Sequence, residues 1–304
     1  MYFKAPLIFS ILLYCTIFFA QQTPHFSQYN YNMQIFNPAA VGSRSDMSVS
    51  LLSRSQWVGV DGAPTTQTFS FNIRTKKGLA IGTTLVRDEI GLVNSTNANF
   101  DLSYTLVTAE YRRLAFGLKG GYTFFNNNLA NGITPDNDVY ASTSGQYPNI
   151  GFGIFYYTKK YFFGLSVPYL LKTPEFNIET SDISELSNNI NYFITGGYKF
   201  KLNRDFWFKP TTMLKYISTL PLTIDVNANF LYKEFIESGI SYRNDKTLSV
   251  FTALILKKKY RLGYSYEHKF TNFSANLNTH EIVLHIDFDL KRQSRWLVND
   301  TCYF

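Results

Sequence analysis

His285, Asp287 and Asp289 lie at alternate positions near the C-terminal end of the chain, where imidazole and carboxylate groups could bind a metal ion. On an extended strand, residues i and i+4 are about 13 Å apart, which is too far for both to bind one ion. Residues 225–229 (DVNAN) resemble the start of a calcium-binding loop, but Phe230 occupies the position of the required glycine. The sequence therefore predicts no metal site.

Enzyme motifs are absent as well. The sequence contains no HExxH zinc motif, no GxSxG nucleophile motif, no CxxC pair and no phosphate-binding loop. A phospholipase barrel would need a serine, a histidine and an acid together on its outer face, and of these only His268 lies in the outward-facing series. We therefore predict a protein that is not an enzyme, with no catalytic residue and no cofactor.

A set of charged residues of both signs occupies polar positions of alternating segments. Inside a barrel, such charges either hold the barrel shut through ion pairs or line a narrow water path, and the sequence leaves both alternatives open. The set is Asp101, Asp225, Glu237, Glu267, Arg54, Arg74, Arg243 and Arg261.

The segments that must position these charges alternate between apolar and polar residues, which is typical of β-strands with two unlike faces. Residues 222–232 (LTIDVNANFLY), for example, set apolar side chains against Thr223, Asp225, Asn227 and Asn229. Helical periodicity is nearly absent. The pattern predicts fourteen strands, at 46–57, 65–75, 78–88, 96–106, 113–125, 148–158, 160–170, 189–201, 206–217, 221–232, 235–243, 247–257, 259–268 and 279–290.

Strand length and composition favour a membrane barrel over a soluble barrel or sandwich. The predicted strands are about ten to twelve residues long, and a tilted strand needs roughly 9–11 residues to cross a bilayer. The chain is 17% aromatic, with 22 Tyr and 28 Phe, as interfacial girdles require. We predict an all-β fold: a single transmembrane, antiparallel, up-and-down β-barrel of about 14 strands.

The ends of the chain predict export and three flanking segments. Residues 1–20 have a positive start at Lys4, an apolar stretch and Ala20 at the cleavage point, as in a cleaved signal peptide. An uncleaved helical anchor is the alternative. Residues 21–45 form an N-terminal periplasmic or plug segment, 46–290 the barrel, and 291–304 a C-terminal periplasmic tail. An exported protein does not meet chromosomal DNA, so no nucleic acid is expected as a partner.

Charge separates the two ends of the predicted barrel. The short connections and the tail carry fifteen positive and four negative side chains, a net charge of +11, whereas the long-loop end has a net charge of −5. This basic face could attract an acidic partner, or it could contact anionic headgroups of outer-membrane lipid. The candidate contact residues are Lys76, Lys77, Lys159, Lys160, Lys257, Lys258 and Lys259.

Four ordered segments carry a resemblance to a known family. They are HFSQYNYNMQIFNPAAVGS at 25–43, RSQWVGVDGAPTTQTFSFN at 54–72, GLSVPYLL at 164–171 and NTHEIVLHIDFDL at 278–290. The sequence resembles the PorP/SprF family of type IX secretion system membrane proteins of Bacteroidota. The motif positions are Asn37, Pro38 and Gly42 in the N-terminal segment, and Gln56, Trp57, Gly59, Gly62, Ala63, Pro64 and Gln67 in and after the first predicted loop.

The resemblance implies a cell outer membrane protein tied to type IX protein secretion and, in some relatives, gliding motility. It also implies two kinds of partner: a large secreted adhesin, recognised through its C-terminal domain, and periplasmic components linked to peptidoglycan. For the first loop, contact with cargo and simple closure of the barrel top both remain open. The alternative function is a passive or fatty-acid-type outer-membrane pore.

Overall fold

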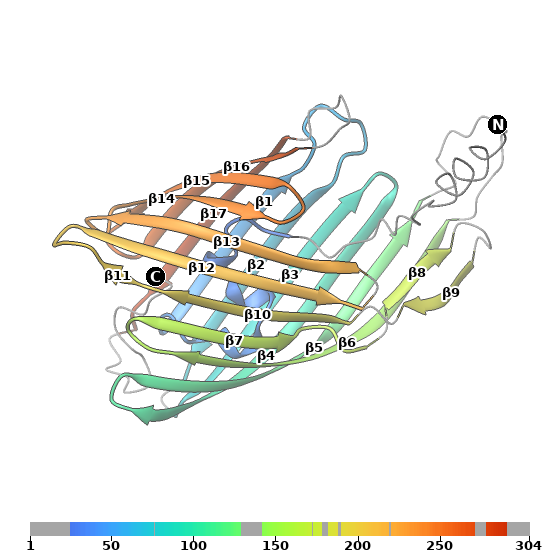
Figure 1. Ribbon diagram of the computed structural model, residues 1–304. Helices are drawn as coiled ribbons and strands as arrows, with labels where there is room; N and C mark the ends of the chain where they lie inside the picture. The colour runs from blue at the N-terminus through green and yellow to red at the C-terminus, as the bar shows by residue number, and fades with distance from the viewer. Residues whose placement is uncertain are drawn as a thin grey trace, which may run out of the picture.

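The computed structural model describes residues 25–75, 77–128, 142–171, 173–177, 182–187, 190–218, 220–270 and 278–290. Its main element is one sheet of fifteen antiparallel strands (Figure 1). The sheet closes into a barrel because β10 (Asn191–Tyr198) pairs with β7 on one side and with β12 on the other. The signal peptide and the C-terminal tail predicted from the sequence lie outside the described residues.

Fourteen strands make up the barrel wall, and the fifteenth, β11 (Phe200–Lys201), is a two-residue extension paired with β12. The predicted 14-strand, antiparallel, up-and-down barrel is therefore confirmed. Besides β10, the wall strands are β1 (Met47–Ser55), β2 (Thr65–Arg74), β3 (Leu79–Ile90), β4 (Val93–Ala109), β5 (Arg112–Asn127), β6 (Thr143–Tyr157), β7 (Tyr161–Val167), β12 (Phe206–Ile217), β13 (Leu220–Tyr232), β14 (Ile236–Arg243), β15 (Thr247–Leu256), β16 (Tyr260–Lys269) and β17 (Asn278–Phe288).

Some of the strand ends predicted from the sequence were wrong beside the long loops. The predicted loop 171–188 contains a separate hairpin, β8 (Thr173–Asn177) and β9 (Asp182–Ser187), which its weak alternation did not reveal. The strand predicted at 160–170 ends at Val167, because Pro168 cannot donate a ladder hydrogen bond. In contrast, β6 continues through Pro148. Proline is tolerated there because β7 pairs only with residues 152–157 of β6.

Side chains alternate between the lumen and the outer surface along each strand. In β15 every second residue from Thr247 is buried and every other one is exposed. The exposed series is apolar, and it includes Leu248, Val250, Leu254 and Leu256. This arrangement inverts that of a soluble protein and matches a barrel surrounded by lipid.

An aromatic band follows the outer surface at the end of the short turns. Neighbouring rings from β6 to β13 contact one another, with Tyr161 stacked on Tyr198 at 6.3 Å and Phe208 against Phe230 at 5.0 Å between ring centroids. Aromatic girdles of this kind mark the membrane interface in outer-membrane barrels. Within the part of the chain that is described, no helix has the length and apolar character needed to span a membrane.

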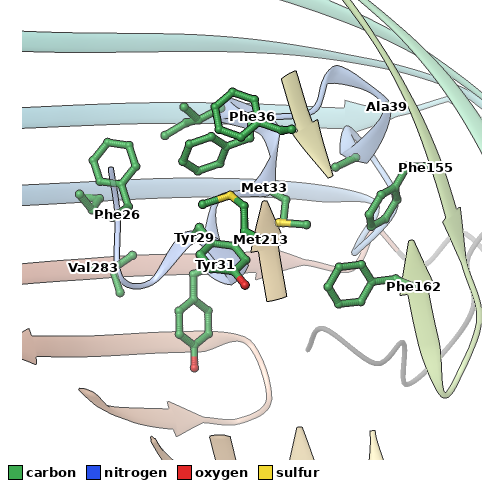
Figure 2. Packing of buried hydrophobic residues seen from close by; sticks show 14 of the residues in the cluster. Phe26, Tyr29, Tyr31, Met33, Phe36, Ala39, Phe155, Phe162, Met213 and Val283 are labelled. Atoms are coloured by element: carbon green, nitrogen blue, oxygen red, sulfur yellow. The ribbon is translucent and has the colours of Figure 1, made fainter. Parts of the chain in front are cut away.

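The described part of the N-terminal segment, residues 25–45, lies inside the barrel and forms three short 3₁₀ helices: η1 (Tyr29–Tyr31), η2 (Met33–Ile35) and η3 (Pro38–Ala40) (Figures 1 and 2). His25 contacts Asp225 near the long-loop end. Arg44 Nε lies 3.2 Å from Asp287 Oδ2 at the short-turn end. The segment therefore runs through the lumen from one end to the other.

Candidate functional site

The Asn37 side chain fixes the N-terminal segment to the wall of the barrel. Its Oδ1 accepts a hydrogen bond from Ala39 N (2.9 Å), which caps η3. Its Nδ2 donates to the carbonyl oxygens of Ile154 in β6 (3.0 Å) and Leu165 in β7 (3.5 Å). Sequence analysis marked Asn37 and Pro38 as motif residues, and the structure places both at the seam between these two strands rather than on a surface.

Glycines in the wall make room for the segment. A Cβ at Gly117 of β5 would collide with the backbone of Pro38 and Ala39, and a Cβ at Gly153 of β6 would collide with the Asn37 side chain. Gly82 and Gly263 leave similar space for glutamine side chains of the segment. The sequence analysis did not predict this role of the glycines. The signal that could have revealed it is a glycine on the lumenal face of a strand, because such a glycine marks a close approach of other atoms.

Gly42, the third N-terminal motif residue, has a positive φ of 68°. A side chain there would be strained by the backbone and would also collide with Ala80. Gly42 therefore lets the segment turn toward the short-turn end of the barrel, where it leads into β1.

One side of the lumen is apolar and packs against the segment (Figure 2). The Phe36 ring lies 5.2 Å from Phe193 and 5.9 Å from Phe26, measured between ring centroids. Met213 and Phe155 are also buried in this cluster. Burial of each such side chain stabilises by about 1.5–3 kcal/mol relative to exposure, so this contact alone holds the segment firmly.

The opposite side of the lumen holds the segment through charge. Near the long-loop end, Arg54 bonds Glu267 (2.7 Å) and Glu281 (3.2 Å). The carboxylate of Glu281 also accepts hydrogen bonds from the backbone N–H groups of Ser27 (3.1 Å) and Gln28 (2.9 Å). Wall and segment thus share one buried ionic network.

Seven of the eight charged residues predicted to line the interior form buried ion pairs. Lys119 reaches Asp101 (2.8 Å), Lys209 reaches Glu237 (2.9 Å), and Arg261 contacts Asp287. Arg243 lies 3.1 Å from Asp225. The eighth residue, Arg74, is buried but forms no ion pair with any described carboxylate.

The first predicted loop, here called the motif loop (residues 56–64), is held by backbone hydrogen bonds at three positions. Gln56 N donates to Pro64 O (2.9 Å) across its base, and Val58 N donates to Asn278 O (3.1 Å) at the start of β17. Gly91 N, in the turn between β3 and β4, donates to Gly62 O (2.9 Å). Trp57, Gly59 and Gly62 have positive φ, so the loop has a defined conformation.

The motif loop presents apolar side chains to solvent. Val58 is 53% exposed and Val60 is 45% exposed, and Ile90 and Leu92 are exposed in the turn bonded to the loop. Of the other motif residues, Pro64 is buried, Ala63 is partly buried, and Gln67 lies exposed on the outer face of β2.

The predicted basic contact residues lie at the opposite end of the barrel from the motif loop. Lys77, Lys159, Lys160, Lys257 and Lys258 are exposed, and Lys259 is partly exposed, with its Nζ 3.2 Å from Asp289. Lys76 lies outside the described residues. The structure therefore brings these lysines to one rim, apart from the motif loop.

Two short turns of this rim hold non-glycine residues in the left-handed region. Lys257 and Lys258 have φ values of 52° and 58°, and Lys233 and Glu234 have φ values of 49° and 53°. A β-turn with positive φ at both central residues favours Asn-Gly at those positions. Keeping lysine there costs roughly 1–2 kcal/mol per residue, and such strain is a reason to look for a function.

The structure defines an outer-membrane β-barrel with an internal segment packed across its lumen and two chemically different ends. The chain belongs to the family described as "Type IX secretion system membrane protein PorP/SprF", whose model matches residues 18–286. The protein is thus an outer-membrane component of type IX secretion. No curated protein matches the chain.

Solved outer-membrane barrels have a similar fold at low sequence identity. The CymD monoaromatic hydrocarbon channel matches with a TM-score of 0.51 and 12% identity, covering 88% of this chain and 94% of that one. The toluene transporter TbuX of Ralstonia pickettii matches with a TM-score of 0.48 and 10% identity, covering 83% and 92%. A Pseudomonas aeruginosa FadL homologue matches with a TM-score of 0.45 and 10% identity, covering 84% and 94%.

Proposed function

We propose that the protein helps to export or anchor a large surface adhesin in type IX secretion and gliding, as a binding component without catalytic activity. The observation that carries this proposal is the exposed apolar tip of the motif loop, Val58 and Val60, which is held in place by backbone hydrogen bonds to two neighbouring connections. A fixed apolar surface binds a partner with little loss of conformational entropy. The C-terminal domain of the adhesin is the proposed occupant.

The basic rim at the short-turn end is the proposed contact for periplasmic, peptidoglycan-linked secretion components. Short turns of outer-membrane barrels face the periplasm. Lys77, Lys160 and Lys257 are exposed there, and a concentrated positive field raises the encounter rate with an acidic partner. The two proposed contacts therefore lie on opposite sides of the membrane, as a link between surface cargo and periplasmic machinery requires.

The double variant Val58→Ser/Val60→Ser tests the outer contact. Both side chains are exposed, so we expect a change in the free energy of unfolding below about 0.5 kcal/mol, together with loss of adhesin from co-purification in mild detergent and from the cell surface. Val250→Ser, on the lipid-facing surface of β15, is the control. Normal recovery of the adhesin with the double variant would exclude the motif loop as the contact, and normal display after deletion of the gene would exclude the function itself.

The second candidate is a passive or fatty-acid-type pore. It is considered because the CymD monoaromatic hydrocarbon channel has a similar fold. The packed N-terminal segment argues against a pore that is always open. One cavity between this segment and the β1–β2 wall has a volume of about 30 Å³, room for one or two waters. Conductance of the wild-type protein in planar bilayers, or uptake of a hydrophobic solute, would favour the pore.

A further inference from the structure

Arg74 is a buried cation that forms no ion pair with any carboxylate of the described residues. It is the last residue of β2 and is 2% exposed. Its Nη2 donates a long hydrogen bond to Tyr157 Oη (3.4 Å), while its Nε and Nη1 have no hydrogen-bond partner among the described residues. Its backbone N–H donates to Asp46 O (2.8 Å), but the Asp46 carboxylate accepts from Leu290 N instead (3.1 Å).

Burial without a counter-ion is expensive for a guanidinium, which stays charged at any physiological pH. The other arginines that the sequence predicted to line the lumen, Arg54, Arg243 and Arg261, are each paired with carboxylates. A buried donor that is left without a partner indicates a bound water or ion. At Arg74 the charge favours an anion over water.

The surroundings of Arg74 add positive charge. Arg113, which is also buried, is the register partner of Tyr157, the residue whose hydroxyl accepts the hydrogen bond from Arg74. The Nη1 of Arg113 is anchored to the carbonyl oxygens of Ala109 (2.8 Å), Glu110 (3.1 Å) and Arg112 (3.0 Å), so this cation is fixed in position.

Among the described buried side chains, cations outnumber carboxylates only in the short-turn half of the lumen. In the long-loop half, Arg54, Lys215 and Arg243 stand against Asp225, Glu267 and Glu281. In the short-turn half, the described buried side chains comprise five cations and three carboxylates. These are Arg44, Arg74, Arg113, Lys209 and Arg261 against Asp46, Glu237 and Asp287.

We propose that Arg74 is the centre of an anion-binding site at the short-turn mouth of the lumen, which takes a carboxylate group of a peptide. The free Nε and Nη1 donors of its planar guanidinium supply charge-assisted hydrogen bonds to carboxylate oxygens. A lipid headgroup is disfavoured, because Arg74 faces the lumen and the bilayer lies on the other side of the wall. The inference rests on the fold and does not depend on the adhesin-binding proposal.

The carboxylate has two possible sources at this mouth. One is this chain itself, because its described part ends at Leu290 beside Asp46 and the sequence continues beyond it with an acidic residue, Asp300. The other is an acidic segment of a periplasmic protein. The binding chemistry is the same in both cases.

The test measures thermal unfolding midpoints of the purified barrel in detergent against increasing glutarate, with chloride keeping the ionic strength constant. The full chain and a chain ending at Leu290 are compared. We expect saturable stabilisation in at least one of them, with the half-saturating concentration raised at least tenfold by Arg74→Gln. Arg204→Gln removes the same charge from an exposed turn at the same end and should leave the response unchanged.

The comparison of the two chains identifies the source. Tighter glutarate binding by the shortened chain shows that the tail occupies the site, and equal binding shows that the natural ligand belongs to another chain; both results support the site. A response of Arg74→Gln equal to that of the wild type, or no saturable response in either chain, overturns the proposal. Should Arg74→Gln fail to fold, Arg74→Lys keeps the charge without the planar fork and is expected to bind glutarate more weakly than the wild type.

Discussion

The two halves of the lumen treat buried charge differently. In the long-loop half, cations and carboxylates balance and also bond the backbone of the N-terminal segment, as Glu281 does with Ser27 and Gln28. In the short-turn half, the cations that the structure describes exceed the carboxylates, and Nε and Nη1 of Arg74 have no hydrogen-bond partner among the described residues. A balanced network suits a part that must stay closed, whereas an unbalanced one suits a part that must accept something from outside.

The backbone repeats this difference. Where the segment meets the wall, glycines such as Gly117 and Gly153 let main chain and side chains approach closely and without strain. On the short-turn rim, Lys257 and Lys258 hold left-handed conformations that glycine or asparagine would adopt more easily. One region is optimised for packing, and the other retains charge against the preference of the backbone.

The largest expected effect comes from breaking the packed region at Gly117. Gly117→Val would place a branched side chain where the backbone of Pro38 and Ala39 lies, so the segment cannot remain seated. We expect residues 25–45 to become sensitive to protease and the barrel to conduct in planar bilayers, while the wild type stays silent.

Gly120 of the same strand provides the control, because a Cβ added there has no atom within 4 Å. Gly120→Val is expected to remain protected from protease and silent in bilayers. A silent, protected Gly117→Val barrel would show that the segment is not what closes the lumen.

Next in size is the loss of a shared ion pair in the balanced half. Glu281→Ala removes a carboxylate from Arg54 and the acceptor from two segment N–H groups, leaving charge and donors buried. Breaking a buried pair in this way costs about 3–5 kcal/mol. Denaturant unfolding followed by tryptophan fluorescence measures the change.

An exposed pair gives the matched comparison for Glu281. Glu89 contacts Arg87 on the outer surface, where the side chains are 40% and 60% exposed. Glu89→Ala should change the free energy of unfolding by less than about 1 kcal/mol. Equal losses for the two variants would mean that the network does not stabilise the packed segment.

The sequence predicted the barrel well because alternation is a local signal repeated along each strand. It also identified the charged lining of the lumen, because a charged residue on the polar face of a strand points away from the apolar face that contacts lipid. The position of Asn37 was not predictable, because it bonds Ile154 and Leu165, more than one hundred residues away. The β8–β9 hairpin was missed because a strand pair of five and six residues alternates too briefly to stand out.

The unmatched charge of Arg74 was equally out of reach of the sequence. In the sequence Arg74 is one of eight charged residues of both signs, and only the packing shows that seven form ion pairs and that Arg74 forms none with a described carboxylate. Burial and pairing are properties of distant contacts, so a local pattern places a charge on a face without showing its counter-ion.

The last effect, and the one of opposite sign, concerns the strained rim. Lys257→Asn/Lys258→Gly restores the residues that a β-turn with positive φ at both central positions prefers. We expect the free energy of unfolding to rise by about 1–2 kcal/mol and the recovery of periplasmic secretion components in a pull-down to fall. The control, Lys160→Asn/Lys201→Asn, removes the same charge from positions without positive φ and should not raise stability.

The two readouts separate strain from charge. If the turn variant gains stability while its periplasmic partners are recovered as before, the lysines are not kept for binding and the contrast between the two regions is confined to the lumen. If stability rises and recovery falls only in the turn variant, the fixed geometry of Lys257 and Lys258 matters more than the charge of the rim. Equal loss of recovery in both variants would mean that the partner senses the positive field as a whole, and that the strained geometry adds nothing to it.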